Sequence, residues 1–189
     1  MRATNKSLLE RVALTIRRPP SAPGRGTASV LAQAASAYSA RPTIDEAAEL
    51  TGFDPEAAAV FEAVVEAAYL VANADGVFDD EERSAFQSLV ATACDNLVQL
   101  RQLEALTADF RELLAEDGVE KRARMIARTV SERDHQLEVL RIAALMAHVS
   151  GGVSAEEHAV IAELARGFTL DAEVVAEALQ QAAAALDLD

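Results

Sequence analysis

The chain has 189 residues, a length that suits one domain or one domain with an appendage. Hydrophobic residues make up 51% and charged residues 25%, which excludes wholesale disorder. The single cysteine excludes a disulfide framework and a thiolate zinc site, and the formal net charge of −14 argues against nucleic-acid binding by the folded body.

The charge is unevenly distributed along the chain. Residues 1–42 contain seven basic side chains and one acidic one, whereas residues 43–189 contain 10 basic and 30 acidic ones. We therefore expect a basic N-terminal arm over 1–42 and an acidic domain over 43–189. No apolar stretch reaches the roughly 18 residues of a membrane span, and the N-terminus lacks the apolar core of a secretory signal. This pattern predicts a cytoplasmic protein.

The basic arm is predicted to contain two helices. Residues 5–18 place apolar side chains on one helical face, a Pro- and Gly-rich linker follows over 18–26, and an Ala- and Ser-rich helix covers 28–39. Three interpretations are open: a disordered tail, a helix on the anionic inner face of a membrane, or a segment that folds against a partner. The apolar face argues against disorder, and opposite charge favours docking onto the acidic domain over peripheral membrane contact.

The acidic domain is predicted to be helical throughout, because apolar residues recur at helical spacing and no period-two alternation marks a strand. A capping box at Thr43–Glu46 opens a short helix that Gly52 ends. Asp54 and Pro55 then open a helix with one wide apolar face. The predicted helices after residue 54 cover 55–74, 80–94, 96–116, 119–130, 134–149, 155–167 and 172–186.

The acidic domain also contains an internal repeat with an offset of 75 residues. Each copy has an apolar helix, a glycine-containing turn and an acidic helix with a capping box. The capping boxes lie at Asp79–Glu82 and Ser154–Glu157. Any two helical hairpins share some matches, but the ungapped register favours duplication. The expected fold is all-α, a helical bundle built from two repeated helix-turn-helix hairpins.

The turn after the first apolar helix contains the strongest candidate site. Asp75 lies at the C-terminal end of that helix, where the helix dipole disfavours an acid by about 0.3–1 kcal/mol. Asp75 and Glu82 flank one turn, and carboxylate oxygens are the ligands that Ca²⁺, Mg²⁺ and Mn²⁺ prefer. A structural interpretation competes, because Asp-Gly is an ordinary turn pair and Glu82 completes a capping box. The spacing does not match an EF-hand loop.

A family resemblance supports the metal interpretation. The stretch VANADGVFDDEER, residues 71–83, followed by a second acidic hairpin, resembles the tellurite-resistance TerB family. That family is in turn similar to the N-terminal region of DnaJ-type membrane co-chaperones. The resemblance covers roughly residues 55–170. The resemblance implies an all-helical bundle without known catalytic activity. Members of the family are linked to tellurium-anion resistance, stress responses and metal-dependent signalling.

The resemblance also implies metal ligands, one Asp and one Glu in each repeat. In the first repeat these are Asp75 and Glu82. In the second repeat Glu157 matches, but Ser150 stands where an Asp is expected. A site with three carboxylates instead of four would bind a divalent ion more weakly or not at all.

Other chemistry-bearing residues carry less of a signal. His135, His148 and His158 do not form a spaced pair of metal ligands. Cys94 lacks a basic neighbour that would activate it, so we expect a small core residue. We predict no catalytic residue and no enzymatic activity.

Two functions follow as hypotheses. The first is a non-enzymatic, TerB-like module that binds Ca²⁺, Mg²⁺ or Mn²⁺ through Asp75, Glu82 and Glu157 and acts on protein partners in a stress response or in signalling. The alternative is a metal-free helical scaffold or co-chaperone-like interaction module. In that alternative Ser150 marks a decayed site and the acids only cap helices.

Overall fold

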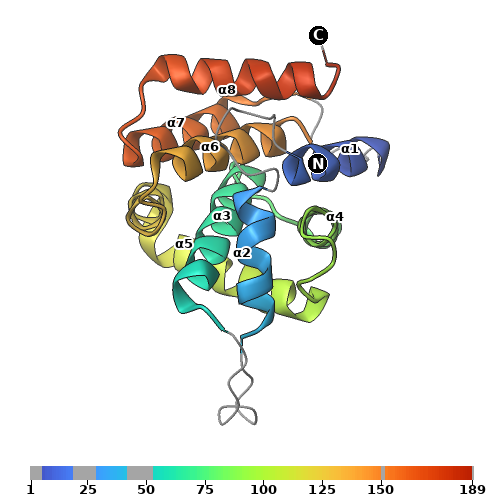
Figure 1. Ribbon diagram of the computed structural model, residues 1–189. Helices are drawn as coiled ribbons and strands as arrows, with labels where there is room; N and C mark the ends of the chain where they lie inside the picture. Colours follow the sequence, from blue (N-terminus) through green and yellow to red (C-terminus); the bar gives the residue numbers. More distant parts are fainter. Residues whose placement is uncertain (1–5, 19–28, 42–52, 150–151, 189) are drawn as a thin grey trace.

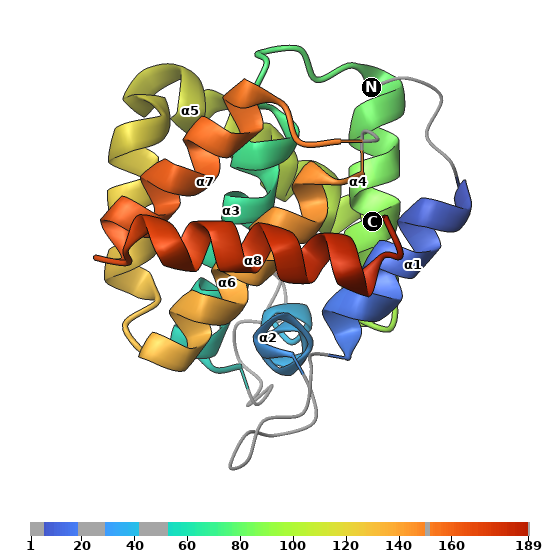
Figure 2. The same ribbon diagram turned by 90° about the horizontal axis from the view of Figure 1, so that it is seen from above.

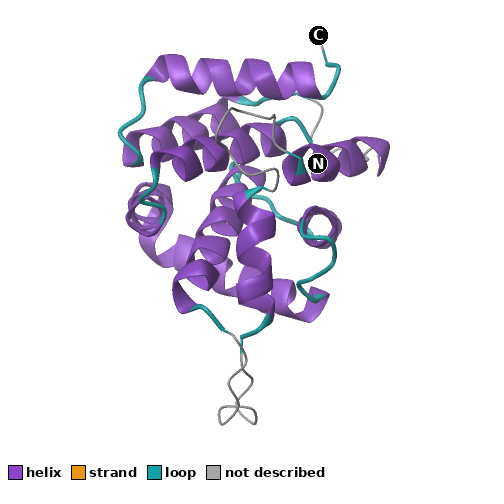
Figure 3. Cartoon of the chain, viewed as in Figure 1, coloured by secondary structure: helices purple, strands orange, loops and turns teal. Residues whose placement is uncertain are grey.

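The computed structural model describes residues 6–18, 29–41, 53–149 and 152–188. In these ranges the chain forms eight α-helices and no strand (Figure 3), which confirms the all-α expectation. The helices are α1 (Lys6–Arg17), α2 (Val30–Ser39), α3 (Pro55–Ala72), α4 (Asp80–Ala93), α5 (Leu100–Thr129), α6 (Arg133–Ala147), α7 (Ala155–Gly167) and α8 (Ala172–Ala185). The linker after Arg18, the expected boundary at residue 42 and the capping box at Thr43 lie outside the described residues.

Helices α3 and α6 pack against each other at the centre of the bundle (Figure 1). Helix α8 covers α6 on one side, and α2 and α5 cover α3 on the other (Figures 1 and 2). Residues 139–147 of α6 are buried without exception, including the charged Arg141. Every helix contributes to one continuous hydrophobic core. None of the helices in the described ranges has the length and apolar character that a bilayer crossing requires.

The two helices of the basic arm belong to this core. Helix α1 packs against α4 and α6 and buries Val12, Ala13 and Ile16. Helix α2 lies along α3, where the ring of Tyr38 stacks on that of Phe61 with 4.6 Å between their centroids. Of the three interpretations of the arm, docking onto the acidic domain is the one that α1 and α2 adopt.

Polar contacts from α6 hold the arm in place. In α6, Glu138 Oε1 accepts a 2.8 Å hydrogen bond from the amide of Val30, the first residue of α2. One turn further on, the Arg141 guanidinium donates to the carbonyls of Thr15 (3.2 Å) and Ile16 (3.4 Å), in the last turn of α1. An anion at a helix N-terminus and a cation at a helix C-terminus both complement the helix dipole.

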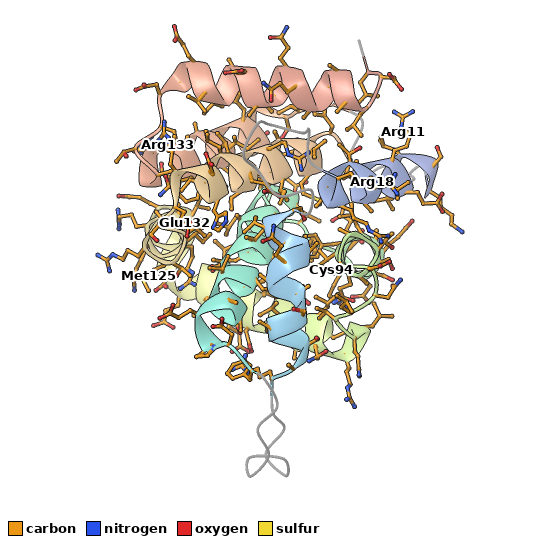
Figure 4. All side chains as sticks on the ribbon, in the orientation of Figure 1. Arg11, Arg18, Cys94, Met125, Glu132 and Arg133 are labelled. Atoms are coloured by element: carbon orange, nitrogen blue, oxygen red, sulfur yellow. The ribbon has the colours of Figure 1, made fainter. Side chains whose placement is uncertain are left out.

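Two further arginines, both in α1, add contacts at its surface. The Arg11 side chain points toward the C-terminal end of α8 (Figure 4), where it donates to the carbonyl of Leu186. Arg17 forms a 2.7 Å ion pair with Asp95, just after α4. These contacts connect α1 to the segment after α4 and to the C-terminal end of α8.

Helix α5 differs from the prediction at its start and matches it at its break. It begins at Leu100 instead of residue 96, because Asp95 and Asn96 adopt left-handed φ values of 58° and 57°. Gly118 interrupts it with φ 72° and ψ 164°, at the predicted separation between two helical segments. Other predicted helix ends in the described ranges agree with the structure to within two residues.

Gly118→Ala is expected to lower the free energy of unfolding by about 1–3 kcal/mol, because the backbone angles of Gly118 lie in a region that only glycine adopts readily. A Cβ atom built at this position meets no heavy atom within 4 Å, so the loss would come from backbone strain alone. Urea denaturation of the wild type and the variant measures it. The exposed neighbour Glu116→Ala is the control, expected within about 0.5 kcal/mol of wild type. Equal stability of Gly118→Ala and wild type would contradict the prediction.

Candidate functional site

The three predicted metal ligands line one cavity of about 260 Å³ between the two helical hairpins. Asp75 comes from the α3–α4 turn, Glu82 from the first turn of α4, and Glu157 from the first turn of α7. Glu156 joins them from α7. We call this space the acidic cavity. Residues about 75 positions apart in the sequence thus face a common space.

Asp75 is positioned by the turn that ends α3. Helix α3 stops at Ala72, and Gly76 then takes a φ of 76°, which allows the chain to reverse. The Oδ1 atom of Asp75 accepts a 3.0 Å hydrogen bond from the amide of Val77, an Asx-turn that holds the side chain. The Asp75 side chain is exposed at the mouth of the cavity. Its carboxylate therefore has a structural bond through one oxygen only.

Glu82 and Glu157 occupy the same position in two capping boxes. Glu82 Oε2 accepts from the Asp79 amide at 3.3 Å, and Glu157 Oε2 accepts from the Ser154 amide at 2.7 Å. The reciprocal bonds, from the Glu82 amide to Asp79 Oδ1 (2.8 Å) and from the Glu157 amide to Ser154 Oγ (3.1 Å), complete both boxes. Glu82 is buried. Both predicted caps are confirmed, so each glutamate has a local structural role as well.

The chemistry of the acidic cavity suits a hard cation, but its side chains are not gathered into a ligand set. The charged side chains at its rim are all carboxylates, and the carbonyl end of α3 adds negative potential. In the part of the chain that the structure describes, no group of three His, Cys, Asp or Glu side chains could hold one metal ion as they stand. Ser150, at the fourth expected ligand position, lies outside the described residues.

The floor of the acidic cavity is apolar, which the sequence pattern did not indicate. It is formed by Leu9, Val71, Phe78, Phe86, Met146 and Val149. Leu9 belongs to α1, so the basic arm closes one side of a cavity whose rim is acidic. The amphipathic pattern of 5–18 predicts that Leu9 is covered, but a pattern within one helix does not say which distant surface covers it.

The remaining candidates lie away from this cavity. Cys94, labelled in Figure 4, is fully buried beside α4, and burial raises the pKa of its thiol to about 12, so it is a core residue as predicted. His148 lies 3.4 Å from the carbonyl of Leu179, and His135 lies 3.7 Å from the carboxylate of Glu132. His158 is exposed.

Comparison with known proteins identifies no relative of this chain. Family models, curated proteins and solved structures were all compared with the chain, and none of them matches it. The resemblance to the TerB family therefore continues to rest on residues 71–83 and on the second acidic hairpin.

Proposed function

We propose that this chain is a non-enzymatic, TerB-like helical module that binds a divalent cation at the acidic cavity through Asp75, Glu82 and Glu157. The observation that carries the proposal is that three carboxylates chosen from sequence line a single cavity. Their oxygens are of the type that Ca²⁺, Mg²⁺ and Mn²⁺ prefer. Binding of the cation would change the charge that this surface presents to protein partners in a stress response or in signalling.

The positions of the helix ends support the duplication on which the proposal depends. Helices α3 and α6 end at Ala72 and Ala147, and helices α4 and α7 begin at Asp80 and Ala155, so both pairs are separated by 75 residues. Each turn therefore has the same length and leads into a capping box. Two copies of one hairpin, packed through α3 and α6, would bring both acidic helix starts to one cavity.

A second candidate function is a metal-free scaffold for protein partners. It is favoured by the capping bonds of Glu82 and Glu157, which explain both residues without an ion. It is also favoured by the finding that the described side chains form no ready ligand group. The two candidates differ in one measurable property, the response of stability to divalent ions.

Thermal melting with and without Ca²⁺, Mg²⁺ and Mn²⁺ tests the first candidate. An ion at 100 times its dissociation constant stabilises the folded state by about 2.7 kcal/mol. For a chain of this size that shift is roughly 5–10 °C in Tm. The informative variant is Asp75→Asn, because its amide oxygen can still accept from Val77 while the charge is lost. We expect the ion-induced shift to disappear in this variant.

The matched control is Glu81→Gln, which removes an exposed acid of α4 that does not line the acidic cavity. It should respond to the ion like wild type. An absent shift in wild type, or an equal shift in Asp75→Asn, would remove the cation proposal and leave the metal-free scaffold.

A further inference from the structure

A second cavity, of about 400 Å³, lies between α3, α4 and α5. We call it the polar cavity. Its floor includes Tyr69, Gln87 and Thr107, and its rim includes Arg83, Glu104 and Arg111. The ring of Phe78 lines both this cavity and the acidic cavity and so stands between them. The volume of the polar cavity lies in the range of about 300–1,000 Å³ that is typical of small-molecule sites.

The floor of the polar cavity holds an acceptor without a partner. The Thr107 hydroxyl donates to the carbonyl of Leu103 at 2.8 Å, so it must accept the 2.9 Å hydrogen bond that joins it to Gln87. The atom of Gln87 that bonds Thr107 is therefore the amide nitrogen, Nε2. The carbonyl oxygen of Gln87, Oε1, accepts no hydrogen bond within the described chain, although the residue is only 6% exposed.

The Tyr69 hydroxyl is in the same situation. Tyr69 is 1% exposed, its ring packs against those of Phe78, Phe86 and Phe110, and its hydroxyl has no hydrogen-bond partner in the described ranges. Burial raises the pKa of this hydroxyl, and the charge of Arg111 opposes the shift only in part, so it stays protonated at neutral pH.

Both unpartnered atoms belong to residues at the floor of the cavity. Across the described side chains, Arg141 Nε is the one fully buried nitrogen or oxygen without a hydrogen bond. The Tyr69 hydroxyl and Gln87 Oε1 are not among the fully buried atoms, and both residues line the polar cavity. Polar atoms of residues that are this little exposed usually have a hydrogen-bond partner in the protein or in bound water. A donor and an acceptor left open at the floor of one cavity indicate a polar occupant.

The rim supplies one unpaired charge of each sign. Arg83 is neutralised by Asp80 at 2.5 Å. Arg111 and Glu104 form no ion pair with any described residue, and they lie on the same face of α5, about 10 Å apart along the helix axis. Arg111 and Tyr69 line the same cavity. Glu104 lies one helical turn before Thr107, the partner of Gln87.

We propose that the polar cavity binds a small zwitterion, a molecule with one carboxylate and one ammonium group, of the kind represented by free amino acids. Arg111 and the Tyr69 hydroxyl would hold the carboxylate. Glu104 and the carbonyl oxygen of Gln87 would hold the ammonium group. Such a molecule would hydrogen-bond to the Tyr69 hydroxyl and to Gln87 Oε1 at the floor. It would also pair with the charges of Arg111 and Glu104 at the rim. The site does not depend on a cation at the acidic cavity.

Calorimetric titration of the full chain tests this proposal, with the free α-amino acids and 4-aminobutyrate as probes. Butyrate and butylamine keep the skeleton of 4-aminobutyrate and remove one charge each. We expect saturable binding of at least one zwitterion, and at least tenfold weaker binding of both singly charged analogues. Tyr69→Phe and Gln87→Met should each weaken that zwitterion at least tenfold.

Both variants are expected to fold, because the Tyr69 hydroxyl bonds nothing and Thr107 keeps its bond to Leu103 without Gln87. Their melting temperatures without ligand establish this. Glu112→Gln, an exposed neighbour of Arg111 outside the cavity lining, is the control and should bind like wild type. Absence of zwitterion binding, preference for a singly charged analogue, or unchanged binding by Tyr69→Phe would overturn the proposal.

Discussion

Replacing Arg122 by methionine is expected to lower the free energy of unfolding by about 3–5 kcal/mol, because it leaves a buried carboxylate without its partner. The Arg122 guanidinium binds both carboxylate oxygens of Glu66, with Nε–Oε1 at 2.5 Å and Nη2–Oε2 at 2.9 Å. Its third contact is Asp117, at 3.0 Å. The side chains of Arg122 and Glu66 are only 11% and 7% exposed. Denaturant titration followed by circular dichroism measures the loss.

The geometry explains why so large an effect is expected. A bidentate, charge-assisted pair in a poorly solvated position is among the stronger polar contacts in proteins. The hydrogen bond to Glu66 is the main reason that the pKa of Arg122 is raised, so the guanidinium cannot lose its charge. Arg122 also joins α3 to the residue just before the Gly118 break, and it thereby holds the two segments of α5 together.

A double variant separates loss of the pair from loss of packing. Glu66→Leu combined with Arg122→Met removes both charges and should recover most of the lost stability, because a buried pair can often be replaced by apolar residues at little cost. Lys121→Met is the control, since Lys121 forms a more exposed pair with Asp117 and should change stability by about 1 kcal/mol or less. A small effect of Arg122→Met, similar to that of the control, would falsify the prediction.

Much of the helical fold could be predicted because its signals are local. Asp54 caps α3 through the amides of Glu56 and Ala57, and the capping boxes that open α4 and α7 lie where the sequence places them. A capping box is formed by two residues three positions apart, so it can be recognised from a short stretch of sequence alone. The start of α5 was predicted too early, although Asp95 and Asn96 are of the two types that, after glycine, adopt left-handed angles most readily.

The contacts that assemble the helices were not predictable in this way. Glu66 and Arg122 are 56 residues apart, and Arg141 and Ile16 are 125 residues apart. Nothing in the period of a helix selects a partner at that distance. A shared site for Asp75, Glu82 and Glu157 was suggested by the repeat and the family resemblance, whereas the cavity that they line was not predicted. The polar cavity was missed, since Tyr69 fits the apolar face of α3 and Gln87 and Thr107 resemble ordinary helix residues.

Replacing Arg141 by methionine is expected to lower the free energy of unfolding by about 3 kcal/mol, because two charge-assisted hydrogen bonds are lost and each contributes roughly 1.5–3 kcal/mol. Arg141 is 9% exposed and donates to the carbonyls of Thr15 and Ile16. Those carbonyls belong to the last turn of α1, where the helix has no amides left to satisfy them. Urea denaturation measures the loss.

The local consequence distinguishes this variant from one that is merely less stable. Hydrogen exchange read by mass spectrometry should show faster exchange in α1, whereas the amides of α3 and α6 should keep most of their protection. Arg17→Met is the control, because it removes only the exposed ion pair with Asp95 and should leave α1 protected. Uniform loss of protection over all helices in Arg141→Met would contradict the anchoring role.

The anchor also connects the arm to the acidic cavity. Leu9 of α1 lines that cavity, so a variant in which α1 is released should expose its apolar floor. We therefore expect Arg141→Met to bind a hydrophobic dye more strongly than wild type, and Arg17→Met to bind it like wild type. A dye signal that stays at the wild-type level in Arg141→Met while α1 exchanges freely would mean that Leu9 does not cover the cavity in solution. The arm would then be attached to the body without closing the site.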